Sequence, residues 1–311
     1  MPKVSVITPC YNSEKFIAST IESVRRQSLQ DWEHLVVDDG SSDRSEAIIQ
    51  GYLKNDSRIK LISQNHAGVC RARNHGFEAA SVTSAYLLFL DADDCLEPEM
   101  LEKLVCYLDA HQDVGLIRCE YQFIDEKGVK IEHSEGKYRF APSGWWVRKL
   151  SPDEPETPFV SVFTLCGIIP SITLIRRSVY EQTPGFDETF GHHHEDADLF
   201  ISIALRSLVH FFPQKLVRRR RHAGQNTMDT PEFRIKAGEQ ERKLYAKWFH
   251  AEGLSEVQRK MIRSAWRFKE GRLEPYLAFR RARNCLSQAQ LLNASRNCAG
   301  GLKRYILSFI P

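Results

Sequence analysis

The feature that most constrains this fold is a repeated pattern in the first 110 residues, where short apolar runs alternate with segments of helical apolar spacing. The apolar runs predict strands at 3–8, 34–37, 60–63 and 86–90. Strands joined through helices run parallel, because each crossover returns the chain to the same end of the sheet. The pattern therefore predicts an α/β fold, with a mainly parallel sheet flanked by helices on both sides.

The second half of the chain has a different pattern. We expect a half-exposed strand at 114–123, a helix at 195–208, and a strand pair or strand–loop segment at 211–220. Residues 127–158 are irregular in composition, with Gly, Pro, Trp145 and Trp146. After about residue 230 the apolar spacing becomes helical, which predicts a helical C-terminal extension.

The most apolar part of the second half is the stretch 159–175. A membrane-spanning helix needs roughly 20 consecutive apolar residues, and this stretch is shorter and contains Gly167 and Pro170. We therefore expect buried strands here and no membrane span.

Composition argues against several classes of protein. Lys and Arg number 43 against 40 Asp and Glu, and the net charge of +3 gives no reason to expect a nucleic-acid partner. The eight cysteines include no Cys-x-x-Cys pair, so a zinc cluster is not expected. The first strand follows the N-terminus without a signal-peptide pattern. We therefore expect a cytoplasmic protein with reduced thiols.

Polar segments follow three of the predicted strands, at 9–12, 38–43 and 91–94. The carboxyl ends of parallel strands lie at one edge of a sheet, and ligands of such folds bind there. Ser13, directly after the first polar segment, is expected to cap the following helix. Position alone therefore predicts a binding site built from these three segments.

Three carboxylates crowd the third of these segments, at Asp91, Asp93 and Asp94. Neighbouring carboxylates repel one another unless a cation or hydrogen-bond donors compensate them, and hard oxygen ligands suit Mg²⁺ or Mn²⁺. An acidic turn at the start of the next helix would have the same composition. Taken alone, the cluster is equally consistent with a metal site and with a helix start.

Two further acidic pairs have the same ambiguity. Asp39 ends a predicted strand, where it could accept hydrogen bonds from a base or a ribose, or belong to the turn. Glu195 and Asp196 open a predicted helix, where they could favour the positive end of the helix dipole or act as a general base.

Seven motifs in one order make the sequence resemble a known family. The first four are VSVITPCYN, QDWEHLVVDDGSSDRS, NHAGVCRARNHG and YLLFLDADD. The others are TPGFDETF, HEDADLFISIALR and RRRRHAGQNT. Together they resemble the inverting family 2 glycosyltransferases, which have the Rossmann-like GT-A fold. Cys70 departs from the pattern, since a small residue often stands there.

The resemblance implies a nucleotide-sugar donor, with uridine diphosphate as the default nucleotide. Carried over position by position, Pro9 and Tyr11 line the base pocket, Asp39 binds the base or ribose, and Arg73 supports the nucleotide. It covers about residues 3–228. It implies a nucleotide-binding half at 1–110 and an acceptor and catalytic half at 111–228, followed by a helical extension at 229–311.

The same resemblance implies a divalent cation, Mn²⁺ or Mg²⁺, and a catalytic base. Asp91 and Asp93 match the DxD element, with Asp93 as the direct metal ligand, and His222 matches a residue near the diphosphate or metal. Asp196 matches the general base, with Glu195 beside it. The acceptor implied is the hydroxyl of a glycan, a lipid-linked molecule or another compound.

Two other functions remain as alternatives. A catalytically silent nucleotide-sugar-binding or scaffold protein would have the same fold, and the presence of both the DxD element and the Glu-Asp pair argues against it. A nucleotidyltransferase would need a Gly-rich basic triphosphate loop, which the segment 9–12 does not supply.

Four segments keep two interpretations each. The histidines 192–194 are expected in a polar loop in preference to a metal site, and at most two of the arginines 218–221 are expected to point inward. Trp145 and Trp146 are equally consistent with sugar stacking and with core packing. Residues 299–311 combine basic and apolar side chains, which is consistent with packing on the first domain or with peripheral contact at the inner face of a membrane.

Overall fold

The computed structural model of the protein describes residues 1–132, 156–165, 168–224 and 231–273. The chain forms two compact units, one of Met1–Pro158 with Cys166–Leu244 and the other of Phe159–Leu165 with Tyr245–Pro311. The functional division expected at residue 228 stays a prediction. Trp145, Trp146 and the segment 299–311 lie outside the described residues.

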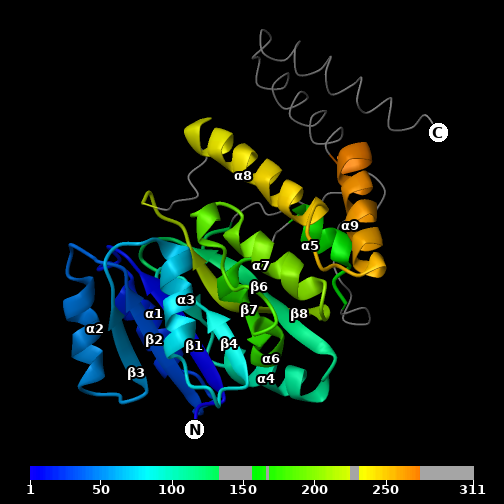
Figure 1. Ribbon diagram of the computed structural model, residues 1–311. Helices are drawn as coiled ribbons and strands as arrows, with labels where there is room; N and C mark the ends of the chain where they lie inside the picture. The colour runs from blue at the N-terminus through cyan, green and yellow to red at the C-terminus, as the bar shows by residue number, and fades with distance from the viewer. Residues whose placement is uncertain (133–155, 166–167, 225–230, 274–311) are drawn as a thin grey trace. The chain divides into compact units, whose positions relative to one another are not determined.

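One sheet of eight strands organises the first unit, in the order β3-β2-β1-β4-β7-β6-β8-β5 (Figure 1). Its strands are β1 (Val4–Cys10), β2 (Trp32–Asp38), β3 (Ile59–Ser63), β4 (Tyr86–Phe89), β5 (Cys95–Leu96), β6 (Val114–Ile124), β7 (Thr173–Arg176) and β8 (Leu208–Arg220). Strands β1 to β4 are parallel, β7 runs antiparallel to β4 and β6, and β5 runs antiparallel to β8. Strands β6 and β8 also pair in parallel. The predicted α/β fold with a mainly parallel sheet is confirmed.

Helices cover the sheet, and further helices follow its last strand in the chain (Figure 1). In the first unit they are α1 (Ile17–Arg25), α2 (Ser45–Leu53), α3 (Val69–Ala79), α4 (Met100–Ala110), α6 (Arg177–Tyr180) and α7 (Glu195–Ala204). The second unit contains α5 (Phe159–Leu165) and α9 (Glu256–Phe268), and α8 (Pro231–Phe249) runs from the first unit into the second. The predicted C-terminal helices are therefore present.

The central strands are apolar on both faces because both faces are covered. Val4 and Val6 of β1 belong to the core that includes Ile21 of α1 and Leu104 of α4. Ile7 follows Val6, and successive side chains of a strand point to opposite faces. Ile7 therefore lies on the other face, against Gly76 of α3. A strand buried on both faces gives the continuous apolar run seen in the sequence.

The predicted edge for binding is present. Parallel pairing aligns Cys10 with Asp38 and Ile7 with Phe89, so the segments after β1, β2 and β4 emerge at one edge of the sheet. The backbone N–H of Asp39 donates to the carbonyl of Cys10 at 2.8 Å and extends this alignment by one residue.

The second unit has a small aromatic core of its own. The ring of Tyr245 lies 5.0 Å from Phe163 of α5 and 5.1 Å from Trp266 of α9. Lys269 places its Nζ 3.5 Å from the centre of the Tyr245 ring. Ser255 begins α9 with a capping box in which its side chain and that of Gln258 bond each other's backbone.

Three local expectations were wrong. Residues 159–165 form helix α5 and not a strand, because a short apolar run has no periodicity that separates the two. Helix α7 ends at Ala204, and Leu208 already begins β8. Ser13 does not cap α1 with its side chain: the helix has Phe16 at its N-cap position, and the carbonyl of Ser13 accepts from the backbone.

In the described part of the chain, no helix combines the length and apolar character needed to cross a bilayer.

Gly76 offers a direct test of how α3 packs on the sheet. A Cβ at this position would overlap Cγ2 of Ile7 and stand 3.1 Å from Cγ2 of Val37. We expect Gly76→Ala to lower the free energy of unfolding by about 1–3 kcal/mol, the usual cost of overpacking. Gly51→Ala in α2 is the control, since a Cβ there meets nothing within 4 Å and should stabilise by roughly 0.5–1 kcal/mol. Urea unfolding measures both, and equal stabilisation by both changes would contradict this packing.

Candidate functional site

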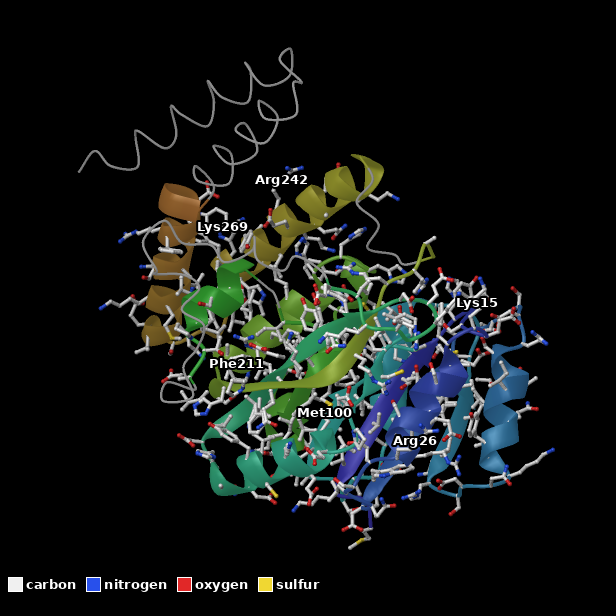
Figure 2. All side chains as sticks on the ribbon, turned by 180° about the vertical axis from the view of Figure 1, so that it is seen from behind. Lys15, Arg26, Met100, Phe211, Arg242 and Lys269 are labelled. Atoms are coloured by element: carbon white, nitrogen blue, oxygen red, sulfur yellow. The ribbon has the colours of Figure 1, made fainter. Side chains whose placement is uncertain are left out.

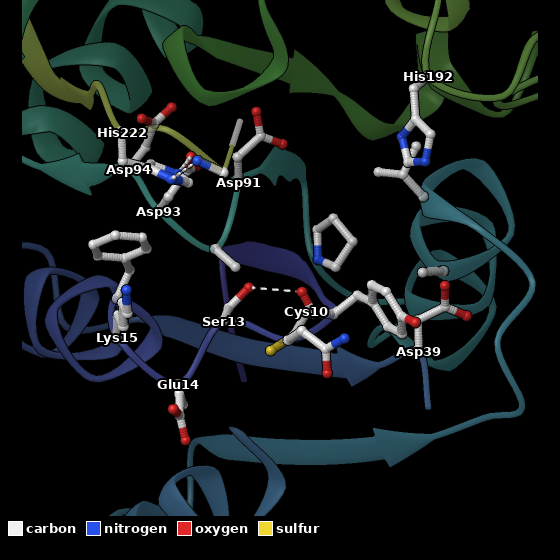
Figure 3. A pocket seen from close by; sticks show the side chains of 18 of the residues that line it. Cys10, Ser13, Glu14, Lys15, Asp39, Asp91, Asp93, Asp94, His192 and His222 are labelled. Carbon is white, nitrogen blue, oxygen red and sulfur yellow. Dashed lines mark hydrogen bonds and ion pairs between the residues drawn. The ribbon is translucent and has the colours of Figure 1, made fainter. Parts of the chain in front are cut away.

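A cavity of about 710 Å³ opens at the carboxyl edge of the sheet (Figure 3). Its walls come from the β1–α1 loop, the ends of β2 and β4, helix α3, the start of α7 and the segment after β8. The predicted site residues that line it are Pro9, Tyr11, Asp39, Arg73, Asp91, Asp93, Glu195 and His222. The topology therefore brings together residues as distant in the chain as Pro9 and His222, which the sequence motifs predicted as parts of one site.

Asp39 is buried at one end of the cavity, and its carboxylate is already engaged by the loop after β3. Oδ1 accepts from the side chain of Gln64 at 2.7 Å and from the backbone N–H of Ala67 at 2.8 Å. Oδ2 accepts from the backbone N–H of Gly68 at 2.9 Å, and Nδ1 of His66 lies 2.9 Å from the same oxygen. In this structure Asp39 anchors the loop that leads into α3.

His66 is a site residue that the sequence analysis missed. Its ring stacks on Tyr11 with centroids 4.1 Å apart, and Tyr11 is 47% exposed. The two rings form an aromatic wall of the cavity beside Asp39. A signal was available, because the segment containing His66 follows the third parallel strand and so emerges at the same edge as the other three.

Arg73 of α3 joins the acidic cluster to the Glu-Asp pair. Its guanidinium is buried and donates to Oδ1 of Asp91 at 2.9 Å and to Oε1 of Glu195 at 3.1 Å. Burial raises the pKa of the Asp91 carboxyl, Arg73 opposes that shift, and neighbouring Asp93 adds to it. The guanidinium thus compensates two carboxylates that would otherwise repel one another.

The three carboxylates after β4 have different surroundings. Asp93 points to His222, with 3.0 Å between Oδ2 and Nε2, and both line the cavity (Figure 3). Asp94 is 2% exposed and accepts from the backbone N–H of Arg220 at 3.0 Å. Burial and the neighbouring carboxylates Asp93 and Asp91 raise the pKa of Asp94 well above its ordinary value. All three carboxylates line the cavity, and Asp94 also joins the turn to β8.

The arginines at the end of β8 divide as the alternation of a strand requires. Arg220 is buried and donates to the carbonyls of Asp93, Asp125 and Glu126. Arg219 lines the cavity, and Arg218 pairs with Glu97 at 3.3 Å.

The Glu-Asp pair opens α7, directly after the left-handed residue His194. Asp196 accepts from the backbone N–H of Ala197 at 2.7 Å. Burial, and then the charge of Glu195, raise the pKa of Asp196 to about 7. Glu195 lines the cavity, whereas Asp196 is not among the residues that line it. His192, from the loop before the pair, also faces the cavity (Figure 3).

Comparison with known proteins decides the family. The model of the family described as glycosyl transferase family 2 matches residues 5–183, more than half of the chain. The chain belongs to glycosyltransferase family 2. The match includes the acidic segment after β4 and ends before α7.

Two relatives of this chain are described as glycosyltransferases. Glycosyltransferase EpsJ of Bacillus subtilis is 40% identical over 121 residues, which are 39% of this chain and 34% of EpsJ. Glycosyltransferase GlyG of Streptococcus pneumoniae is 26% identical over 185 residues, which are 58% of each chain. The matched segment thus covers about a third of EpsJ and somewhat over half of GlyG.

Solved structures share the GT-A fold at low identity. TarS of S. aureus, residues 1–349 in complex with UDP-GlcNAc, has a TM-score of 0.63 at 20% identity and covers 99% of this chain and 82% of its own. The mannosyltransferase PcManGT of Pyrobaculum calidifontis, in complex with GDP-Man and Mn²⁺, has a TM-score of 0.64 at 16% identity, covering 100% and 76%.

The side chains that could ligate a metal at this site fit an ion that binds together with a substrate. Among the described residues, no group of three or more His, Cys, Asp or Glu side chains is arranged to hold a metal ion. Asp93 and His222 nevertheless bring two donors to within 3.0 Å of each other at the cavity. Mg²⁺ at nucleotide sites typically takes one or two carboxylates and completes its shell with phosphate oxygens and water. The residues present fit that arrangement.

The anchoring role of Asp39 can be tested separately from ligand binding. An asparagine offers one acceptor oxygen, while the N–H groups of Ala67 and Gly68 bond opposite oxygens of Asp39. One of the two N–H groups therefore loses its acceptor in Asp39→Asn, which should lower the free energy of unfolding by about 1–3 kcal/mol. Exposed Asp31→Asn is the matched control and should change stability by less than about 0.5 kcal/mol. If urea unfolding gives Asp39→Asn the same stability as the wild type, the loop is not held by this carboxylate.

Proposed function

We propose that this chain transfers a sugar from a nucleoside diphosphate sugar to an acceptor hydroxyl, with inversion at the anomeric carbon. The observation that carries the proposal is the contact of Arg73 with both Asp91 and Glu195, because it joins the acidic turn after β4 to the Glu-Asp pair of α7. One cavity then has a place for a leaving diphosphate and, beside it, a place for a base.

The nucleotide occupies the end of the cavity walled by Pro9, Tyr11 and Asp39. Tyr11 offers an exposed ring face on which a base stacks, and the end of β2 supplies Asp39. Arg73 supports the nucleotide side through its contact with Asp91. Uridine diphosphate is the default nucleotide. TarS, of similar fold, is in complex with UDP-GlcNAc, and PcManGT is in complex with GDP-Man.

The diphosphate occupies the part of the cavity beside Asp91, Asp93 and His222. A dianionic leaving group does not bind stably next to carboxylates unless a cation separates them. Asp93, with His222 and Asp91, would hold Mn²⁺ or Mg²⁺ there, and the ion would stabilise the negative charge that develops on the leaving diphosphate. The complex of PcManGT with Mn²⁺ supports this part of the proposal.

Asp196 takes the proton of the acceptor hydroxyl. The carboxylate of Glu195 is bonded to Arg73 at 3.1 Å, and Glu195 serves to orient the start of α7. Asp196 has no such cation bonded to it by a described contact, and a pKa raised to about 7 makes it a better base near neutral pH. The acceptor is a glycan, a lipid-linked molecule or another hydroxyl compound, and peripheral membrane contact through 299–311 belongs to this proposal.

The metal site predicts the behaviour of Asp93→Asn. This change keeps the size of the side chain and removes the charge that a divalent cation needs. We expect Mn²⁺ to raise the affinity of the wild type for UDP at least tenfold, and to have little effect on the variant. Isothermal titration with UDP, with and without Mn²⁺, measures the difference, and circular dichroism checks the fold. An undiminished Mn²⁺ effect in Asp93→Asn removes Asp93 from the ligand set.

The base predicts the behaviour of Asp196→Asn. The amide keeps the hydrogen bond from Ala197 but cannot accept a proton, so transfer to the acceptor should fall by about 10²–10⁴ while UDP binding persists. Both kcat and kcat/KM should fall together, as for an interaction made in the transition state. Transfer at the wild-type rate would make Asp196 a helix-start residue and would favour the silent binding protein.

The pH profile is a second measure of the same base. Protonated Asp196 cannot accept a proton, and its pKa lies at about 7, so kcat/KM should rise with pH and level off above that value. Glu195 raises this pKa through its charge, so Glu195→Gln should move the midpoint to lower pH. A profile that does not change with pH between 5 and 8 would contradict the assignment.

A further inference from the structure

Helix α3 lines the cavity. At its N-terminal end, Gly68 is the N-cap, and the N–H groups of Ala67 and Gly68 bond the carboxylate of Asp39. Along its length, Cys70 and Asn74 bond the segment between α6 and α7, and Arg73 bonds Glu195 at the start of α7.

Asn74 is bonded to both backbone groups of one residue in that segment. Its Oδ1 accepts from the backbone N–H of Phe186 at 3.0 Å, and its Nδ2 donates to the carbonyl of Phe186 at 2.9 Å. The same Nδ2 lies 3.2 Å from Oε1 of Glu188. Gly185 approaches so closely that a Cβ there would stand 3.0 Å from Oδ1 of Asn74. A primary amide is the neutral side-chain group that can donate and accept in this paired way.

Two neighbouring side chains of α3 continue the attachment toward α7. The thiol of Cys70 donates to the carbonyl of Gly191 at 3.1 Å, and Arg73 bonds Glu195 at 3.1 Å. The guanidinium of Arg73 also lies 4.9 Å from the ring centre of Phe186. Three successive points of the segment are therefore held by one helix.

The segment itself contributes little regular structure. Gly185, Gly191 and His194 all have positive φ, of 75°, 63° and 65°, and the regular part between them is the 3₁₀ turn Glu188–Phe190. A non-glycine residue with positive φ costs energy that surrounding contacts must offset. Within the segment, the N–H of Phe190 donates to the carbonyl of Asp187 at 3.1 Å and that of His193 to the carbonyl of Phe190 at 3.3 Å. Lys243 of α8 donates to the carbonyl of Thr189 at 2.7 Å, and the contacts with α3 hold the segment on either side of that point.

We propose that Asn74 is a positioning residue that fixes the segment 185–195 on α3 and thereby sets Glu195 and Asp196 relative to the bound nucleotide. The proposal rests on the proposed function for its catalytic consequence, and on contacts alone for its structural one. Because α3 also holds the loop of Asp39, the same helix sets the distance between the nucleotide end and the base.

The structural consequence is tested without any turnover. In Asn74→Ala, amide hydrogen exchange of peptides covering 185–197 should speed up at least tenfold, while peptides of β1 and β2 keep wild-type exchange. Asn55→Ala, which removes an exposed amide bonded to Gly51, is the matched control and should leave 185–197 unchanged. Wild-type exchange of 185–197 in Asn74→Ala overturns the proposal.

The catalytic consequence is tested with defined probes. With Mn²⁺ and whichever of UDP-GlcNAc and GDP-mannose the wild type hydrolyses, Asn74→Ala should lower kcat about 10–10²-fold, the effect of a small misplacement of catalytic groups. Affinity for the matching nucleoside diphosphate should stay within about twofold. Equal losses of affinity and kcat would make Asn74 a general structural residue and overturn the positioning role.

A milder pair of variants covers the case in which Asn74→Ala does not fold. Cys70→Ala removes the bond to Gly191 and should speed exchange of 185–197 and lower kcat in the same direction, while Cys70→Ser retains a donor and should restore both. No difference between the Ala and Ser variants overturns the proposal. If the wild type hydrolyses neither donor, the proposed function is in question, and the exchange measurements still decide whether α3 holds the segment.

Discussion

The guanidinium of Arg73 is the contact on which the site depends. It is 3% exposed, and a buried cation is stable only when anions lie against it. Asp91 comes from the turn after β4 and Glu195 from the start of α7, more than a hundred residues later. Without the arginine, the carboxylates of Asp91 and Glu195 would repel one another. The positive charge of Arg73 therefore both stabilises the fold and sets the geometry of the site.

The charges around the cavity explain why a divalent cation suits it. Asp91, Asp93 and Glu195 line the cavity, and Arg73 is already shared by two of them. The remaining carboxylate, Asp93, is directed toward His222 at the cavity wall (Figure 3). A diphosphate that enters this space meets more negative than positive charge unless it brings a metal ion. Burial raises the pKa of Asp91 and of Asp94, and the negative charges of neighbouring carboxylates raise both further.

The site belongs to the first of the two compact units. The side chains of the first unit surround the strands as in Figure 2, where Met100 of α4 lies in the core against the sheet and Lys15 and Arg26 lie at its surface. The second unit has its own aromatic contacts around Tyr245. The cavity is thus formed entirely by side chains of the first unit.

The sequence predicted the strands and the edge where they end, because apolar periodicity and strand order are local properties. It did not predict which carboxylate after β4 is tied to another strand: Asp94 accepts from the backbone N–H of Arg220 in β8. It missed His66 because stacking on Tyr11 joins two loops that only the parallel pairing of β1, β2 and β3 brings together. It assigned 159–175 to strands, although 159–165 is helical, since a short apolar run suits either structure.

The central claim is a single displacement, in which the attacking hydroxyl and the leaving diphosphate lie on opposite sides of the anomeric carbon. The most direct measurement is proton NMR of the sugar released when the protein and Mn²⁺ hydrolyse an α-linked donor such as UDP-GlcNAc, recorded before the free sugar equilibrates between its anomers. This account predicts that the β-anomer appears first. First appearance of the α-anomer would contradict it, because that product requires retention at the anomeric carbon.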